Sequence, residues 1–187
     1  ALIASIRDNN PVIFVEHRML YKNAGYVPSE SYEIPFGKGR VLKEGKDITI
    51  VGVSHTVEDA LRASDLLKVV GVSAEVIDPI SLSPLDYDLI RNSANKTKRL
   101  LVIDNGWLTC GFASEIITDI AINCKNISCQ RIGFAETPCP TTPSLEKYFY
   151  PNPRSIAIEA NNMCDGDNKW NPPEVTQDEI VSFKGPF

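Results

Sequence analysis

The stretch from Asp47 to Asp86 constrains the fold more than any other part of the chain. It opens with Ile48–Val53, a nearly unbroken β-branched run without polar alternation, which is typical of a strand buried on both faces of a parallel sheet. Apolar residues at helical spacing follow, and Gly71 stands where a left-handed cap would end that helix. Ala74–Asp78 then reads as a second strand. The stretch therefore predicts a βαβ unit, and about 98% of such crossovers are right-handed.

Capping residues predict where two helices begin. Thr56 with Asp59 one turn later resembles a capping box, so the first helix is expected to start there. Ser83 as cap, Pro84 at the first helical position and Asp86 at the third predict a second helix that runs to about Thr97.

The remaining pattern continues the alternation of strands and helices. Strands are expected at 12–16 (continued by 17–21), 40–44, 99–104 and 128–134, and helices at 112–124, 144–150 and 153–163. This order predicts an α/β fold, a three-layer α/β/α domain with a mostly parallel, about five-stranded sheet.

Composition divides the chain into segments. Residues 22–39 carry glycines and prolines without periodicity, and about eighteen such residues exceed the usual connection within a domain. We expect residues 1–21 to end a preceding domain, 22–39 to be a linker, 40–163 to form the α/β domain and 164–187 to be a tail. Trp170, Phe183 and Phe187 are the only large anchors of that tail. Because residue 1 is Ala, we expect a fragment or a processed chain.

Charge and cysteine content exclude several classes of protein. The net charge of −5 does not favour binding to nucleic acid or to an anionic membrane, and no apolar run is long enough to span a bilayer. The chain has 5 cysteines, an odd number without a CxxC pair, which favours free thiols over a disulfide framework or a zinc site. We therefore expect a cytoplasmic protein, or one of an organelle matrix.

Candidate catalytic residues are few and isolated. The carboxyl edge of an open α/β sheet normally presents the ligand site, and the loops expected there contain His55, Cys110 and Cys139. His55 could act as a general base and either cysteine as a nucleophile. No acid stands at a spacing expected to orient His55, so a capping or surface role is favoured.

Two further groups favour contacts over catalysis. Gly106-Trp107 with Gly111-Phe112 matches no phosphate-binding loop, and an exposed Trp–Phe pair at a sheet edge favours a protein interface. Glu16-His17-Arg18 is either an interdomain polar cluster or a solvated strand end. Asp165-Gly166-Asp167 suggests a metal–diphosphate motif, but it lies in the aperiodic tail and is discounted.

Several segments in collinear order resemble one family. Ile6–Tyr21 resembles the end of the pyrimidine-binding domain of 2-oxoacid dehydrogenase E1 β-subunits. The segments similar to the transketolase C-terminal domain are Ile34–Val41, Glu44–Val51, Glu75–Asp78, Leu82–Asp86, Gly106-Trp107, Gly111–Ile116 and Thr137–Pro140. The resemblance covers about residues 1–160.

The resemblance implies a thiamine-diphosphate-dependent enzyme that decarboxylates a 2-oxoacid, or a related enzyme acting on a ketose. In that family the diphosphate, its Mg²⁺ and the activating glutamate lie on other domains, so this chain is expected to bind no cofactor and to be inactive alone. Its implied partners are a second copy of itself, the missing cofactor-binding domains or α subunit, and, in E1 complexes, an acyltransferase core. The interface candidates are Glu16, His17, His55, Trp107, Gly111 and Phe112.

Two alternatives stay open. The added tail and the non-acidic Lys125-Asn126 leave room for a stand-alone transketolase-like enzyme acting on a sugar. A non-catalytic binding or regulatory module with the same fold is the other, and a flavodoxin-like nucleotide-binding domain is disfavoured by the glycine pattern.

Overall fold

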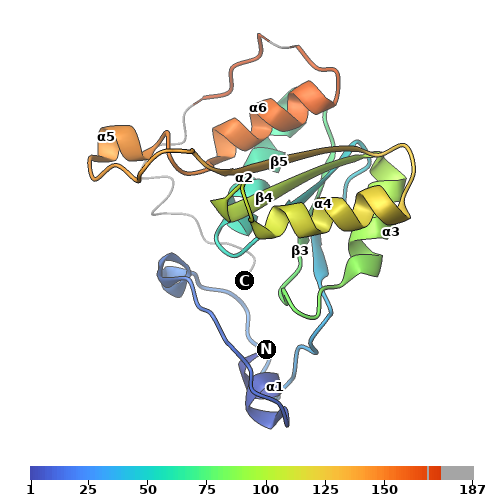
Figure 1. The fold of residues 1–187 in the computed structure, drawn as a ribbon, viewed down its shortest axis with the longest axis vertical. Coiled ribbons are helices and arrows are strands. Elements are labelled where there is room, and N and C mark those ends of the chain that lie inside the picture. The colour runs from blue at the N-terminus through green and yellow to red at the C-terminus, as the bar shows by residue number, and fades with distance from the viewer. Residues whose placement is uncertain (168, 174–187) are drawn as a thin grey trace.

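A computed structural model describes residues 1–167 and 169–173 of the chain, and its centre is a five-stranded sheet with strand order β1-β3-β2-β4-β5 (Figure 1). The strands are β1 (Arg40–Lys43), β2 (Ile48–Gly52), β3 (Ala74–Asp78), β4 (Arg99–Trp107) and β5 (Ser128–Phe134). All neighbouring strands pair in parallel except β1, which runs antiparallel to β3 with Arg40 opposite Asp78. The predicted α/β fold and mostly parallel sheet are confirmed.

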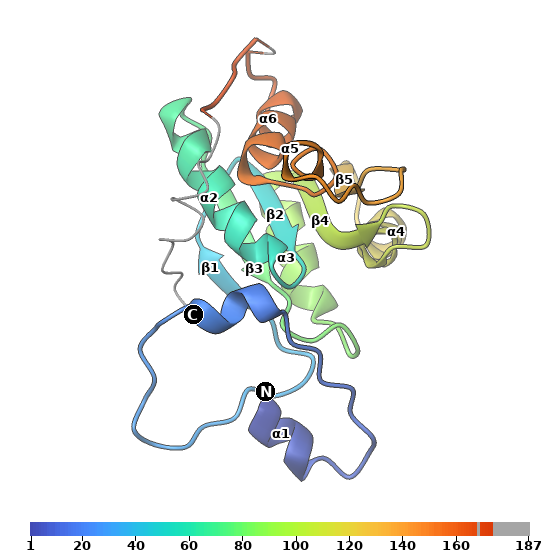
Figure 2. The same ribbon diagram turned by 90° about the vertical axis from the view of Figure 1, so that its left-hand side faces the viewer.

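Helices cover both faces of the sheet, which gives the three predicted layers (Figures 1 and 2). The helices are α1 (Leu2–Arg7), η1 (Arg18–Lys22, a 3₁₀ helix), α2 (Thr56–Val69), α3 (Tyr87–Thr97), α4 (Phe112–Asn123), α5 (Pro143–Glu146) and α6 (Pro153–Met163). Helices α2 and α6 pack on one face of the sheet, and α3 and α4 pack on the other.

Alternate residues of β2 enter the two halves of the core. Ile48 and Ile50 lie under α2 and α6, whereas Val51 lies with α3 and α4. Every residue of β2 is buried, as its unbroken apolar run predicts. The hydroxyl of Thr49, the polar exception, is hydrogen bonded to Ser93 Oγ at 2.6 Å and Thr97 Oγ1 at 2.8 Å. The strand therefore crosses the core without an unpaired side-chain polar group.

The helix boundaries differ from the predicted caps at two places. Asp86, not Ser83, caps α3, because its carboxylate accepts the Leu89 N–H at 3.2 Å. Thr56 begins α2 but caps nothing, since its hydroxyl bonds the backbone of Val53 and of Ile103. The end of α2 is as predicted, with Gly71 at φ +79°.

The predicted strand at residues 12–16 is wrong, as is its continuation through 17–21. Residues 11–17 form neither helix nor strand, and 18–22 are the 3₁₀ helix η1. A strand needs a neighbour that accepts its backbone hydrogen bonds, and no described strand lies beside this run. Ile13 and Val15 are accordingly 91% and 85% exposed. Figures 1 and 2 show residues 1–39 below the sheet, as α1 and η1 joined by long loops.

The segment after β5 is only partly as predicted. Helix α6 has the expected bounds, but the helix expected at 144–150 is limited to α5. Within the described part of the tail, Trp170 packs against the core under α2 and α6. Phe183 and Phe187, the other predicted anchors, lie outside the described residues.

We expect the exposure of two isoleucines of α4 to determine their contribution to stability. Ile120 is 1% exposed and faces the sheet, whereas Ile122 is 75% exposed. Ile120→Ala should lower the free energy of unfolding by about 2–5 kcal/mol, because it leaves a cavity in the core. Ile122→Ala, the control on the same helix, should change it by less than about 0.5 kcal/mol. Urea unfolding measures both, and equal losses would contradict the packing described here.

Candidate functional site

The carboxyl ends of β2, β3, β4 and β5 meet at one edge of the sheet, where ligand sites of open α/β sheets are usually found. Two groups of side chains gather at this edge. The histidine cluster consists of His17, Asn23, His55, Glu58 and Asp59, and the aromatic cluster consists of Trp107, Phe134, Phe149 and Tyr150.

The histidine cluster is centred on His55, in the turn between β2 and α2. Its Nε2 lies 3.6 Å from Glu58 Oε2, and its Nδ1 lies 3.5 Å from Asp59 Oδ2. Both carboxylates are on the first turn of α2 and are only 5% and 6% exposed. Each ring nitrogen of His55 thus faces a buried carboxylate.

This arrangement corrects the expectation that no acid orients His55. Residues three and four positions along a helix share a face with the residue that precedes it, so the spacing of Glu58 and Asp59 was a usable signal. The hydrogen bond with Asp59 raises the pKa of His55, and the charge of Glu58 acts in the same direction against the effect of burial. The two carboxylates thus stabilise the imidazolium form of His55 relative to a free histidine, which does not favour a role as general base.

His17 brings the N-terminal residues onto this cluster. The His17 and His55 ring centroids are 5.1 Å apart at an interplanar angle of 31°. Burial lowers the pKa of His17, and the nearby His55 lowers it further. Asn23 Nδ2, a few residues on, donates to Glu58 Oε1 at 3.0 Å. His17 and Asn23 therefore bring the N-terminal segment into contact with His55 and Glu58.

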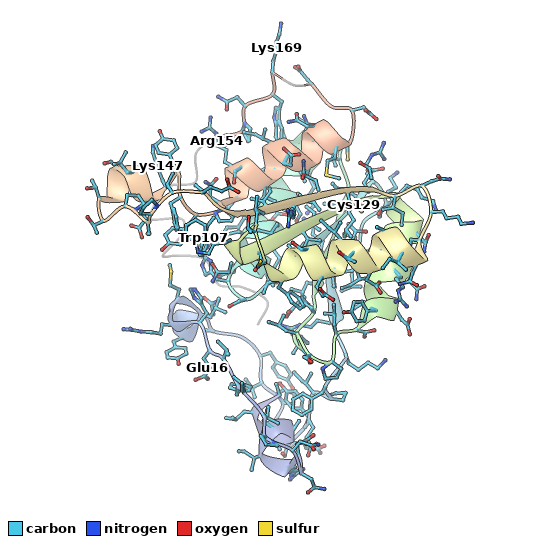
Figure 3. All side chains as sticks on the ribbon, viewed as in Figure 1. Glu16, Trp107, Cys129, Lys147, Arg154 and Lys169 are labelled. Carbon is cyan, nitrogen blue, oxygen red and sulfur yellow. The ribbon has the colours of Figure 1, made fainter. Side chains whose placement is uncertain are left out.

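Glu16 does not join the histidine cluster. Its carboxylate accepts a hydrogen bond from Tyr21 Oη at 3.1 Å, and both side chains are exposed. Figure 3 labels Glu16 on the loop below the sheet.

The aromatic cluster forms around Trp107 at the ends of β4 and β5. The Trp107 ring meets Phe134 edge-on at 6.1 Å and Phe149 edge-on at 5.7 Å between centroids. Trp107 nevertheless stays 46% exposed and borders an open hollow lined also by Leu108, Thr109, Glu136, Thr137 and Pro138. Figure 3 shows Trp107 on the side of the molecule where the segment with Lys147 projects.

The predicted pairing of Trp107 with Phe112 is not what the structure contains. Phe112, the first residue of α4, packs against the core between the sheet and helices α3 and α4. The partners of Trp107 come instead from β5 and from the segment after α5, and no local spacing in the sequence indicates them.

Gly111 has a steric role in the loop after β4. A Cβ at this position would lie 2.0 Å from the Trp107 carbonyl oxygen and 2.9 Å from Asp104 Oδ2. That Asp104 oxygen accepts the Ala113 N–H at 2.9 Å, which satisfies the amino end of α4. Gly111 therefore lets the loop close over its own helix start.

The two exposed cysteines of this edge lack a base. Cys110 is in a left-handed turn at φ 58°, and Cys139 Sγ lies 3.4 Å from Tyr150 Oη. The chain has 2 histidines, and both belong to the histidine cluster. Neither thiol therefore has the activating partner that a nucleophilic cysteine needs.

The described part of the chain contains neither a cluster of metal ligands nor a membrane-spanning helix. Within residues 1–167 and 169–173, no three His, Cys, Asp or Glu side chains are placed to hold a metal ion. Asp165 is paired with Arg99 at 3.3 Å, and Asp167 accepts the Lys169 N–H, so the acids of the discounted tail motif serve local structure. No helix in the described part of the chain is long and apolar enough to cross a membrane.

The sheet edge thus carries packing contacts and a polar junction in a three-layer α/β/α domain. Residues 37–156 match the family model described as the transketolase C-terminal domain, and the chain belongs to that family.

Its relatives include β subunits of two kinds of enzyme complex. It is 38% identical over 168 residues to the acetoin:2,6-dichlorophenolindophenol oxidoreductase subunit beta of Cupriavidus necator, covering 88% of this chain and 50% of the relative. It is 36% identical to the mitochondrial pyruvate dehydrogenase E1 component subunit beta of Pisum sativum, covering 87% and 47%. The chain therefore spans about half the length of these relatives.

A solved structure has a similar fold. A split-gene transketolase, determined as an inactive β4 tetramer, superposes with a TM-score of 0.65 at 27% identity over 76% of this chain and 45% of that one.

We expect Gly111 to tolerate no side chain. Gly111→Ala should lower the free energy of unfolding by about 1–3 kcal/mol, because the new methyl group overlaps the Trp107 carbonyl. Gly106→Ala is the matched control, since its Cβ would meet nothing closer than Asp104 Oδ1 at 3.5 Å. Thermal unfolding of both variants measures the difference. A Gly111→Ala variant as stable as Gly106→Ala would contradict the loop geometry.

Proposed function

We propose that this chain is the C-terminal part of a thiamine-diphosphate-dependent enzyme of the E1 β/transketolase type, acting on a 2-oxoacid or a ketose. Its role in that enzyme is subunit assembly and partner docking rather than chemistry. The observation that carries the proposal is the match of residues 37–156 to the transketolase C-terminal domain, in a chain half as long as its E1 β relatives.

The N-terminal residues support the presence of a further domain in the whole protein. The run Val12–Val15 has the composition of a buried strand, yet Ile13 and Val15 are almost fully exposed. We propose that residues 1–21 complete a pyrimidine-binding-type domain, with 22–39 as the linker, 40–163 as the C-terminal domain and 164–187 as a tail. The exposed run would then be buried against that upstream domain.

The side chains at the sheet edge do not fit the cofactor. Thiamine diphosphate is held through a metal ion and through its diphosphate. The described residues contain no cluster of three side chains placed to bind a metal ion, and no glycine-rich phosphate loop. We therefore place thiamine diphosphate and Mg²⁺ on other domains or on an α subunit, and derive no catalytic step from this chain.

The proposed partners follow from the relatives and from the exposed sheet edge. Two relatives are named as β subunits, which supports an α-subunit partner, and the split-gene transketolase is a tetramer of β chains that is inactive. We propose a homodimer, with Trp107 as its main contact because this large ring stays half exposed beside an open hollow. The weaker candidates for this dimer interface are Phe112, Gly111 and Glu16. An acyltransferase core is a further possible partner class in E1 complexes.

The relatives include bacterial and mitochondrial proteins. We propose that this protein works in the cytoplasm or in an organelle matrix.

The isolated chain should not turn over substrate. We expect no reduction of 2,6-dichlorophenolindophenol when the chain is mixed with pyruvate or acetoin, thiamine diphosphate and Mg²⁺, because its described residues form no cluster of metal ligands that would hold the cofactor. Calorimetry with thiamine diphosphate and Mg²⁺ should likewise detect no binding. Turnover by the chain alone would refute the assignment of chemistry to other domains.

The DNA upstream of Ala1 separates the proposal from a non-catalytic module. A reading frame encoding a pyrimidine-binding-type domain with its glutamate supports the enzyme, and a start codon close to Ala1 supports the module.

We expect a dimer whose affinity depends on Trp107. Light scattering at several concentrations should give twice the chain mass, and Trp107→Ala should weaken association at least about tenfold if this ring is a central contact. Tyr148→Ala is the control, since Tyr148 is 72% exposed and outside the ring contacts of Trp107. A strict monomer, or equal effects of both substitutions, would contradict the proposed interface.

A further inference from the structure

The histidine cluster is the place where the N-terminal segment is fastened to the α/β domain. Residues 12–27 are otherwise largely exposed, and among the described residues the ring contact and the side-chain hydrogen bond that join them to the domain come from two side chains: the His17 ring lies on His55, and Asn23 donates to Glu58. How firmly the segment is held therefore depends on the charge state of these few groups.

The two histidines have opposite electrostatic surroundings. His55 lies between the buried carboxylates of Glu58 and Asp59, which favour its protonated form. Arg62, one turn further along α2, opposes them at longer range. Burial and the charge of His55 lower the pKa of His17, and the charge of Asp59 opposes them. At a pH between the lowered pKa of His17 and the raised pKa of His55, the arrangement suits one imidazolium, at His55, covered by one neutral imidazole, at His17.

A proton on His17 disfavours the seated segment for two reasons. It would create a second cation with its ring centroid 5.1 Å from that of His55. It would also require both ring nitrogens of His17 to donate, whereas Nδ1 is buried without a hydrogen-bond partner among the described residues. Both effects are relieved when His17 returns to water.

We propose that His17, His55, Glu58 and Asp59 form a proton-operated latch, which holds residues 12–27 on the domain at neutral pH and releases them as the pH falls below about 6.5. The inference goes beyond the proposed function and concerns a contact within this chain; in the whole protein the same contact would join the proposed upstream domain, which residues 1–21 complete, to the α/β domain.

The pH dependence follows from the two shifts. The pKa of His17 is lower when the segment is seated than when it is free, so seating is complete above the free value of about 6.5 and weakens as the pH falls below it. The pKa of His55 is raised in the folded chain, so the stability from its ion pairs is fully present below the unfolded value of about 6.5 and is lost as the pH rises through the raised value. The latch is therefore tightest between the titration of seated His17 and that of His55.

The test uses NMR on the 187-residue chain. It measures how rigid residues 12–27 are and at what pH each histidine titrates. In the wild-type chain, the heteronuclear NOE values of residues 12–27 should fall between about pH 7.5 and pH 5.5, while those of the sheet stay constant. Because the chain has 2 histidines, each titration can be assigned, and His17 should titrate at a lower pH than His55.

Two variants distinguish the effect of the charge on His17 from the effect of its aromatic ring. His17→Phe keeps an aromatic ring over His55 without a titrating group, so its segment should stay ordered at both pH values. His17→Lys places a permanent charge there, so its segment should be mobile at both. Tyr21→Phe, on the same segment but outside the cluster, is the control and should respond like the wild type.

Three results would overturn the latch. These are a wild-type segment equally ordered at both pH values, a His17→Phe variant that loses order as the wild type does, and two histidines that titrate together. Circular dichroism at both pH values confirms that the domain itself stays folded.

Discussion

The structure depends on two strands, β2 and β4, that are buried on both faces. Ile48, Ile50, Leu101 and Ile103 face one pair of helices, while Val51, Leu100 and Val102 face the other pair. A sheet of this kind has no face that water can cover, so helices must lie on both sides of it. The βαβ connection, the helix order and the loops at the carboxyl edge all follow from that requirement.

Local patterns predicted what local interactions determine. The β2–α2–β3 unit, the left-handed Gly71 and the bounds of α4 and α6 are encoded by neighbouring residues, and each agrees with the structure. The cap of α3 was misassigned because Ser83 and Asp86 are both good capping residues, and only the backbone path decides between them. The β-branched run at residues 12–16 does not form a strand here, because no described strand lies beside it to accept its backbone hydrogen bonds.

The candidate site was harder to predict, because its contacts join distant segments. His17 reaches His55 across the whole linker, and Trp107 meets Phe149 from beyond β5. The hydrophobic periodicity of a sequence gives no information about contacts between residues so far apart in the chain. The carboxylates beside His55 are different: Glu58 and Asp59 follow it at helical spacing, so this part of the cluster could have been recognised from the sequence. Resemblance to a family supplied the function, which the isolated residues did not.

The direction of the short strand β1 has a consequence for the whole protein. Because β1 runs against its neighbours, its first residue, Arg40, lies beside Asp78 at the carboxyl end of β3, where the two side chains form an ion pair at 3.0 Å. The preceding polypeptide is thus delivered to the edge that carries His55 and Trp107. Had these 4 residues run parallel to β3, the same linker would emerge at the opposite edge of the sheet, about 13 Å away at about 3.3 Å per residue. The orientation of the edge strand β1 thus determines which edge of the sheet faces the polypeptide that precedes Arg40.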